Sequence, residues 1–243
     1  MQESVARLID HALLHPTLTD RQLREGCELG KRLRVASVCI KPYAVPLAVE
    51  LLAGSDTAVC TVIGFPHGSS ATEAKRHETQ LACQQGAREV DMVVNVGKVL
   101  GEDWAFVEAD IRAVVETAHA HGAIAKVIFE NEYLPNDALK IELCRICSRV
   151  GADFVKTSTG FGFVNRPEGG MSPIGATDHD LKLMRAHADA RVGVKASGGV
   201  RSYQDALRVI ALGATRIGTS SAEAIVAGQN SEAIPVADQK TLY

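Results

Sequence analysis

The chain has 243 residues, with 26 Lys and Arg against 29 Asp and Glu and a formal net charge of −3. This length permits one large α/β barrel, and the nearly balanced charge, without a basic arm or stripe, gives no support to nucleic-acid binding. The N-terminus carries charges throughout and no stretch reaches the roughly 20 apolar residues of a membrane span, so we expect no secretory signal, no membrane partner and a cytoplasmic protein.

Short β-branched runs alternate with helix-period segments along the whole chain. The short apolar segment Leu8–His11 gives a first strand. Such alternation predicts parallel strands that are joined by right-handed crossovers. The seven further strands are expected at Arg34–Ile40, Thr57–Gly64, Glu89–Asn95, Ile124–Glu130, Phe154–Ser158, Val192–Ala196 and Thr215–Thr219.

Helix boundaries are marked between these strands. Capping-box or related spacings predict helix starts at Thr19 with Gln22, Ser70 with Glu73, Thr177 with Asp180, and Ser202 with Asp205. Glycines that follow periodic stretches predict helix ends at Gly86, Gly122, Gly151 and Gly213.

Eight strand–helix units in this length predict a single (β/α)8 TIM barrel. We find no linker or shift in composition, so we expect one domain over residues 1–243. The alternative is an open doubly wound sheet, which normally has a Gly-rich dinucleotide-binding turn after its first strand. The segment Arg34–Pro42 has no such turn, which favours the barrel.

Four successive strands each carry an ionisable residue within an apolar run. These residues are Asp91, Lys126, Lys156 and Lys195. Lysine and aspartate are rarely buried without partners, and ion pairs that brace the barrel would give doubtful net stability. Three lysines against one aspartate also leave an excess of positive charge, which indicates a catalytic rather than a structural role.

A lysine amine becomes a nucleophile only as the neutral form, and an ordinary lysine has a pKa of about 10.4. A second cation nearby, together with burial, lowers that value. Lys156 and Lys195 lie on adjacent predicted strands and make such a pair. Asp91 could keep Lys195 charged or move protons through a bound water. The residues alone leave open which lysine is the nucleophile.

The later strands end in loops that are rich in glycine and small hydroxyl residues. Backbone N–H groups in such loops bind phosphate, commonly after strands seven and eight of a barrel. The alternative is that the glycines only make tight turns. Expected substrate-binding residues in these loops are Thr159, Gly160, Gly198, Gly199, Arg201, Gly218, Ser220 and Ser221.

The six cysteines are scattered, as buried free thiols would be. Cys144 and Cys147 form a C-x-x-C pair, but no second pair accompanies it, so we predict no metal site. Cys39 lies near the C-terminal end of a strand, where its thiol is expected close to the substrate.

The segments LIDHALLHP, SVCIKP, TVIGFPHG, EVDMVVNVG, FVKTSTGFG and GVKASGGVR, in this order along the chain, resemble the deoxyribose-phosphate aldolase family across nearly the whole chain. The resemblance implies that 2-deoxy-D-ribose 5-phosphate is cleaved to acetaldehyde and D-glyceraldehyde 3-phosphate. It implies that Lys156 forms the imine, that Lys195 lowers the pKa of the imine-forming amine, and that Asp91 relays protons. Asp10 matches a site aspartate near the substrate hydroxyl, and Gly198, Gly199, Ser220 and Ser221 match phosphate-loop positions.

The chain departs from the family pattern at three places. Many relatives read I-D-H-T-L-L-K-P at the start, where this chain has Ala12 and His15. Residues 163–174 form an insertion that is expected to reshape the mouth of the site. The last residue, Tyr243, resembles a tail tyrosine that some relatives fold into the site, although a frayed terminus is an equal alternative.

These observations predict a Schiff-base aldolase that acts on a phosphorylated sugar. It needs no cofactor or metal, because a protonated imine does the work of a Lewis acid. Lys126 is included among the expected substrate-binding residues, and we expect a homodimer or higher homo-oligomer. Two alternatives remain, a Schiff-base aldolase for another phosphorylated sugar and a non-catalytic barrel that binds phosphorylated sugars.

Overall fold

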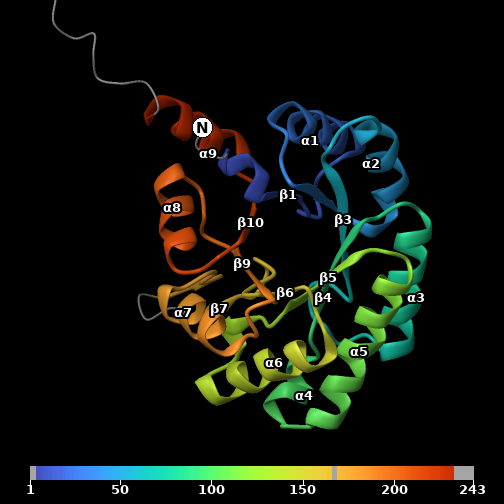
Figure 1. The fold of residues 1–243 in the computed structure, drawn as a ribbon, viewed down its shortest axis with the longest axis vertical. Helices are drawn as coiled ribbons and strands as arrows, with labels where there is room; N and C mark the ends of the chain where they lie inside the picture. The colour runs from blue at the N-terminus through green and yellow to red at the C-terminus, as the bar shows by residue number, and fades with distance from the viewer. Residues whose placement is uncertain (1–3, 166–168, 233–243) are drawn as a thin grey trace, which may run out of the picture.

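The computed structural model describes residues 4–165 and 169–232. Within these residues, eight parallel strands close into a barrel in the order β1-β10-β9-β6-β5-β4-β3-β2, which confirms the predicted TIM barrel (Figure 1). The barrel strands are β1 (Ile9–Leu13), β2 (Ser37–Ile40), β3 (Ala58–Ile63), β4 (Glu89–Val93), β5 (Ile124–Ile128), β6 (Phe154–Lys156), β9 (Gly193–Ser197) and β10 (Arg216–Thr219).

Helices form the outer ring of the barrel (Figure 1). The helices are α1 (Asp20–Leu33), α2 (Val45–Leu52), α3 (Thr72–Gln84), α4 (Val96–Leu100), α5 (Trp104–Ala120), α6 (Asp137–Val150), α7 (Asp178–His187), α8 (Tyr203–Ala211) and α9 (Ala222–Glu232). Short 3-10 turns lie at η1 (Val5–Leu8), η2 (Pro42–Ala44) and η3 (Asn131–Tyr133). None of the helices in the described ranges is long and apolar enough to cross a membrane.

Three of the four predicted helix starts are confirmed. Thr19, Thr177 and Ser202 each accept a hydrogen bond from a backbone N–H of the first turn. The fourth prediction was wrong, because α3 has Ala71 at its N-cap and Ser70 therefore lies one residue too early to cap it. The glycines that were expected at helix ends all adopt positive φ at or just past those ends, as left-handed caps do.

Alternate residues of each barrel strand point to opposite faces. Val127, Val155 and Val194 are fully buried and pack between the strands and the helices. The residues next to them, Lys126, Lys156 and Lys195, therefore point into the barrel. This alternation explains why the strands read as almost continuous apolar runs that a single charged residue interrupts.

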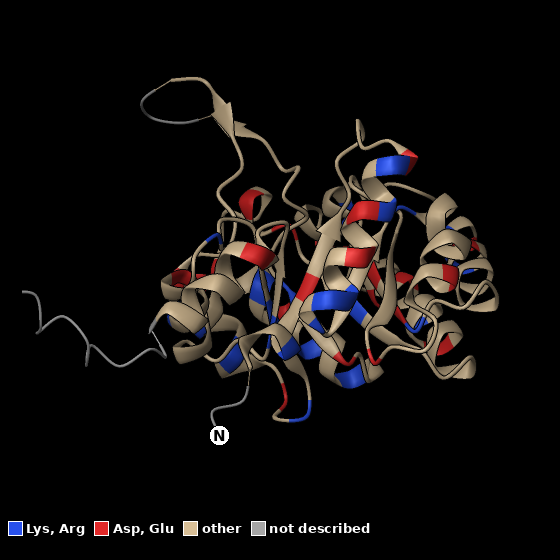
Figure 2. Cartoon of the chain, turned by 90° about the horizontal axis from the view of Figure 1, so that it is seen from above, with Lys and Arg blue, Asp and Glu red and all other residues tan. Residues whose placement is uncertain are grey.

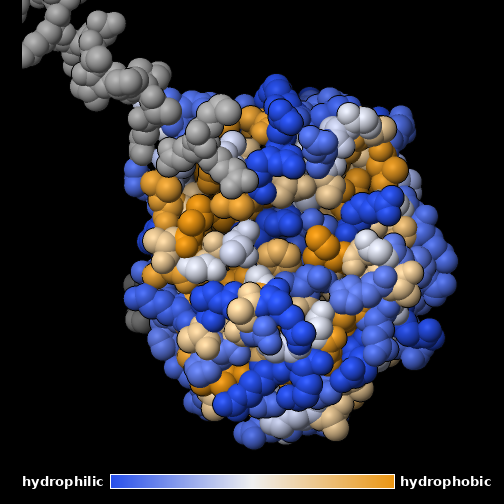
Figure 3. All heavy atoms as spheres, viewed as in Figure 1, coloured by the Kyte–Doolittle hydropathy of each residue, from blue (hydrophilic) through white to orange (hydrophobic). Residues whose placement is uncertain are grey.

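Lys and Arg are interspersed with Asp and Glu around the barrel (Figure 2). On the face seen in Figure 3, hydrophilic residues alternate with smaller apolar groups. This distribution agrees with the near-zero balance of charge in the sequence.

The insertion contains a short antiparallel hairpin, which the sequence did not predict. It pairs β7 (Val164–Asn165) with β8 (Met171–Ser172). The hairpin stands away from the barrel (Figure 2). Two residues that follow it, Pro173 and Ile174, line the cavity described below, so the insertion contributes to the rim of that cavity.

Candidate active site

Asp91 is the centre of a buried layer of charges inside the barrel. Its Oδ2 atom accepts hydrogen bonds from Lys156 Nζ and Lys195 Nζ, each at 2.7 Å, and its Oδ1 atom accepts one from Lys126 Nζ at 2.8 Å. The amines of Lys156 and Lys195 are therefore separated by no more than twice 2.7 Å. The strand register explains the meeting, because Lys156 pairs with Lys195 and Asp91 pairs with Lys126 on neighbouring strands.

Two more carboxylates and one more cation complete the layer. Asp10 accepts hydrogen bonds from Ser37 Oγ at 2.6 Å, from Arg216 at 2.6 Å, and from Lys195. Glu89 lies 2.6 Å from Lys126 Nζ and 3.0 Å from Arg216. The sequence analysis missed Glu89 and Arg216. Glu89 precedes Asp91 by two positions, so the period of two on a strand could have found it.

Asp10 and Asp91 on one side, and Lys126 and Lys195 on the other, stabilise one another's charged forms. Although burial favours the neutral acid, Lys126 and the other cations hold the pKa of Asp91 well below its usual range, and that of Asp10 below it as well. Burial disfavours a charged lysine, yet the carboxylates Asp10 and Asp91 raise the pKa of Lys195 above its ordinary value and that of Lys126 well above it.

Lys156 has the fewest carboxylate partners of the three lysines. It contacts Asp91 alone, whereas Lys195 contacts Asp10 and Asp91, and Lys126 contacts Asp10, Glu89 and Asp91. With Arg216, four cations face three carboxylates in this layer. Lys156 is therefore the lysine with the weakest ion pairing in this layer.

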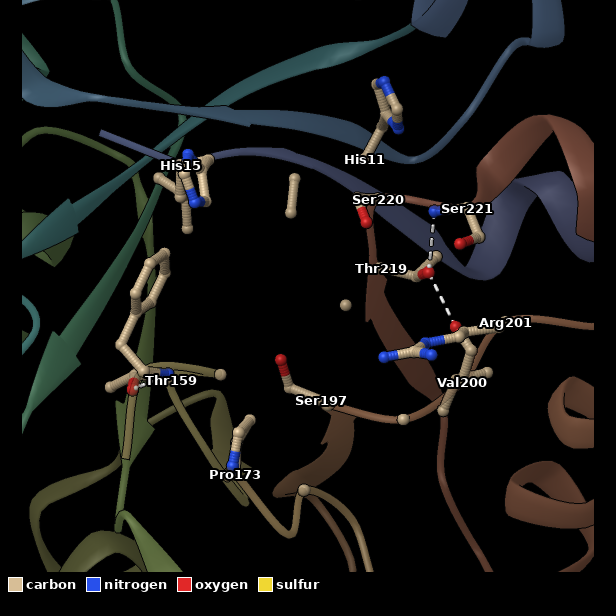
Figure 4. A pocket seen from close by; sticks show the side chains of 18 of the residues that line it. His11, His15, Thr159, Pro173, Ser197, Val200, Arg201, Thr219, Ser220 and Ser221 are labelled. Carbon is tan, nitrogen blue, oxygen red and sulfur yellow. Dashed lines mark hydrogen bonds between the residues drawn. The ribbon is translucent and has the colours of Figure 1, made fainter. Parts of the chain in front are cut away.

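A cavity of about 500 Å³ opens at the C-terminal end of the barrel strands. Figure 4 shows Arg201, Ser220 and Ser221 on one side of it and His15 and Thr159 on the other. The Thr219 hydroxyl donates to Val200 O at 2.7 Å and accepts from Ser221 N at 2.9 Å, which ties the last two strand loops together (Figure 4). The cavity is lined by residues 11–15, Leu18, 159–161, 173–175, 197–201 and 218–221.

The cavity and the charged layer adjoin at Gly218, which lines the cavity and lies beside Lys195. A Cβ atom built on Gly218 would lie 3.1 Å from Lys195 Cε and 2.8 Å from Ser197 Oγ, so only glycine fits between the cavity and Lys195. Thr159 lines the cavity and lies three residues beyond Lys156, on the loop that follows β6. Lys156 retains 2% exposure and Lys126 none. The cavity and the lysines therefore form one site.

The structure separates the sequence-predicted residues into two groups. Eight line the cavity, as expected of substrate contacts, and these are Thr159, Gly160, Gly198, Gly199, Arg201, Gly218, Ser220 and Ser221. Asp10, Cys39 and Lys126 lie below the cavity lining and are buried. The position of Lys126 among three carboxylates favours a role in the charged layer over direct substrate binding.

The positions that depart from the family pattern also lie at the cavity. Ala12 and His15 both line it, and the ring centroid of His15 lies 6.4 Å from that of Phe161. Phe161 and Ser197 are lining residues that the sequence analysis missed, although each stands beside glycines of the predicted loops. Tyr243 falls outside the described residues.

The described cysteines are all free thiols, which agrees with the sequence prediction. Cys39 and Cys60 are paired on β2 and β3 and lie next to Asp91. A hydrogen bond from Cys60 lowers the pKa of the Cys39 thiol, while burial raises the pKa of Cys60 well above its usual range. Lysine ammonium groups already occupy both oxygens of Asp91, so these three residues form part of the lysine cluster.

Several known proteins with similar sequences are named as aldolases. The family model described as DeoC/LacD family aldolase matches residues 4–228. Deoxyribose-phosphate aldolase of Clostridium perfringens strain 13 is 46% identical over 231 residues, which covers 95% of this chain and 98% of the relative. The enzyme of the same name from Bacillus mycoides is 48% identical over 223 residues, which covers 92% of this chain and 95% of the relative.

Two solved structures are similar over almost the whole chain. The aldolase QR15 has a TM-score of 0.86 at 35% identity and covers 97% of this chain and 100% of its own. Deoxyribose phosphate aldolase from Aeropyrum pernix, described as having a unique tetrameric structure, has a TM-score of 0.82 at 31% identity. The match covers 94% of this chain and 92% of the relative. The chain therefore belongs to the DeoC/LacD family of aldolases.

Proposed function

We propose that this chain cleaves 2-deoxy-D-ribose 5-phosphate to acetaldehyde and D-glyceraldehyde 3-phosphate through an imine on Lys156. The observation that carries the proposal is the shared contact of Lys156 and Lys195 with Asp91 Oδ2 beneath the cavity, because only one of the two lysines has a second carboxylate partner. Family membership and the names of the relatives agree with this reaction.

In the proposed reaction, neutral Lys156 attacks the aldehyde carbon of the open-chain sugar and water leaves, which gives a protonated imine. The C2–C3 bond then breaks, and its electron pair passes into the imine to give an enamine. At the same time the C3 hydroxyl loses its proton and becomes the aldehyde of D-glyceraldehyde 3-phosphate, which departs. The enamine accepts a proton at its terminal carbon, and hydrolysis of the new imine releases acetaldehyde and regenerates the Lys156 amine.

Asp91 and Lys195 are suited to assist these proton transfers. Asp91 Oδ2 accepts hydrogen bonds from Lys156 Nζ and from Lys195 Nζ, each at 2.7 Å, so a proton that leaves Lys156 has an acceptor in hydrogen-bond contact. Asp10 and Asp91 flank Lys195 and raise its pKa. A cation beside an amine favours the neutral form of that amine, which supports Lys156 rather than Lys195 as the nucleophile.

The phosphate of the substrate is expected beside Arg201, Ser220 and Ser221, on the side of the cavity that Figure 4 shows opposite Thr159. Arg201→Leu should raise KM for deoxyribose 5-phosphate by about tenfold to a hundredfold and leave kcat nearly unchanged, since the contact is equal in the ground and transition states. Unphosphorylated deoxyribose serves as the control substrate, and its kcat/KM should not change. A large fall in kcat for both sugars would contradict this assignment.

A coupled assay tests the proposed function directly. Turnover of deoxyribose 5-phosphate, with acetaldehyde and glyceraldehyde 3-phosphate both detected, is the expected result, together with a borohydride-trapped adduct that peptide mapping locates at Lys156. Preference for another phosphorylated sugar would support the alternative substrate. Binding of sugar phosphates without any turnover would instead support a non-catalytic barrel and overturn the proposal.

Three further properties belong to the same proposal. A homo-oligomer is supported by the tetramer described for the Aeropyrum pernix relative. A single domain over residues 1–243 is supported by the pairing of β1 with β10, which joins the first and last strands of the barrel. The cytoplasm is supported by the free thiols of the described cysteines, which suit a reducing compartment.

A further inference from the structure

Two glutamates at the end of β5 connect the two glycine-containing loops that form the rim of the cavity. Glu130 Oε1 accepts a hydrogen bond from Thr159 N at 2.9 Å, and Glu130 Oε2 accepts one from the Thr159 hydroxyl. Glu132 Oε1 accepts a hydrogen bond from Gly175 N at 2.8 Å. Thr159 and Gly175 both line the cavity, and they lie on either side of the insertion.

Each glutamate reaches a different wall of the cavity. Thr159 Oγ1 accepts from Phe161 N at 2.9 Å, so Glu130 fixes the loop that follows Lys156. Ala176 N donates to Gly198 O at 3.1 Å, and a Cβ on Gly175 would collide with the backbone of Gly198. Glu132 therefore fixes, through Gly175, the loop that carries Gly198 and Gly199.

The Glu132 carboxyl lies close enough to Glu130 to influence its charge. Glu130 is 2% exposed, and the neighbouring Glu132 carboxyl raises its pKa. Glu132 Oε2 is shielded from solvent and has no hydrogen-bond donor among the described residues. Two ionised carboxylates repel each other, whereas one proton between them gives that oxygen a donor.

The surroundings of Glu130 favour its protonated form at neutral pH. Burial first, and then the contact with Glu132, raise the pKa of Glu130 to about 8. Glu132 of η3 is the titratable group that faces it, while the loop after β6 presents the neutral Thr159 and Gly162. Glu130 itself adopts φ 56°, an uncommon conformation for a residue with a side chain, which indicates that its placement is enforced by these contacts.

We propose that Glu130 and Glu132 are positioning residues that share one proton and thereby hold the two rim loops in the geometry that binds the phosphorylated end of the substrate. The expected effect on KM rests on the proposed function, whereas the shared proton itself does not. Loss of the shared proton at alkaline pH leaves two negative charges in contact, separates the carboxyl groups and displaces Gly175 and the Gly198 loop. Substrate affinity falls while the chemistry at Lys156 continues.

Kinetics against pH test the proposal in the full-length enzyme. KM of the wild type for deoxyribose 5-phosphate should rise about tenfold between pH 7 and pH 9.5, beyond any change in kcat. In Glu132→Gln the amide donates to ionised Glu130 and still accepts from Gly175 N, so KM should stay flat over the same range. Glu116→Gln, which alters an exposed glutamate on α5, is the matched control and should follow the wild type.

A measurement without substrate separates this inference from the proposed function. In ¹³C NMR, one glutamate carboxyl resonance should titrate near pH 8, disappear in Glu130→Gln and move to a lower midpoint in Glu132→Gln. The amide resonance of Gly175 should shift with the same midpoint in the wild type. If the enzyme turns over its substrate but no glutamate titrates near pH 8, or if KM of Glu132→Gln rises as in the wild type, the inference is overturned. If deoxyribose 5-phosphate is not cleaved, the proposed function fails and the NMR titration still decides the inference.

Discussion

Lys156→Arg should abolish cleavage of deoxyribose 5-phosphate, with a fall in kcat on the order of a thousandfold or more. The guanidinium group stays charged at every accessible pH and cannot attack a carbonyl carbon, although it can still contact Asp91. The change therefore preserves a cation in the layer and removes only the nucleophile. A coupled assay together with borohydride trapping measures both consequences.

Two other lysines serve as controls for that result. Lys140→Arg changes a buried lysine that pairs with Asp180 at 2.6 Å outside the cavity, and it should keep nearly full activity. Lys195→Arg keeps the neighbouring charge, so a slower imine should still form at Lys156. Full activity in Lys156→Arg, or a trapped adduct on Lys195 in the wild type, would refute the assignment of the nucleophile.

Asp91→Asn should be costly for both stability and activity. Asp91 is the common partner of Lys126, Lys156 and Lys195, and removal of one member of a buried ion pair typically costs about 3–5 kcal/mol. The amide cannot neutralise any of the three lysines or accept a proton, so kcat should also fall by more than about a hundredfold. Denaturant unfolding and steady-state kinetics measure the two effects.

Asp110→Asn is the matched control for this prediction. Asp110 is a buried aspartate that accepts from Lys75 Nζ at 2.6 Å and from the Thr72 hydroxyl at 2.8 Å, between α3 and α5. Its substitution should cost a similar free energy of unfolding with little loss of kcat at a temperature where the fold is intact. Equal losses of activity in the two variants would mean that the effect of Asp91 is only structural.

The barrel could be predicted from the sequence because its strands are buried on both faces. A strand such as Ile124–Ile128 is apolar except at Lys126, and this exception also marks the residue that points inward. The β7–β8 hairpin could not be predicted, because its two strands have two residues each and no repeated pattern distinguishes them from a loop.

The candidate site was predictable where a charged residue interrupts an apolar strand, as at Asp91 and Lys156. Glu89 and Arg216 were missed because each stands at the start of its strand, where a charged residue is ordinary at a helix–strand junction. The residues alone left the choice between Lys156 and Lys195 open and the family resemblance made it, because the carboxylate partners that distinguish the two lysines lie far away in the sequence. Asp10, which distinguishes the two lysines, comes from β1.

The span of the charged layer along the chain has a consequence for biosynthesis. Asp10 lies in the first strand to leave the ribosome, while its partner Arg216 follows 206 residues later in the last. Until β10 emerges, the nascent barrel lacks the strand that joins β1 to β9, and Asp10 has only some of its final ion partners. The ion pairs around Asp10 are thus completed only after β10 has been synthesised, so chains truncated before β10 would retain Lys156 without Arg216 in the charged layer.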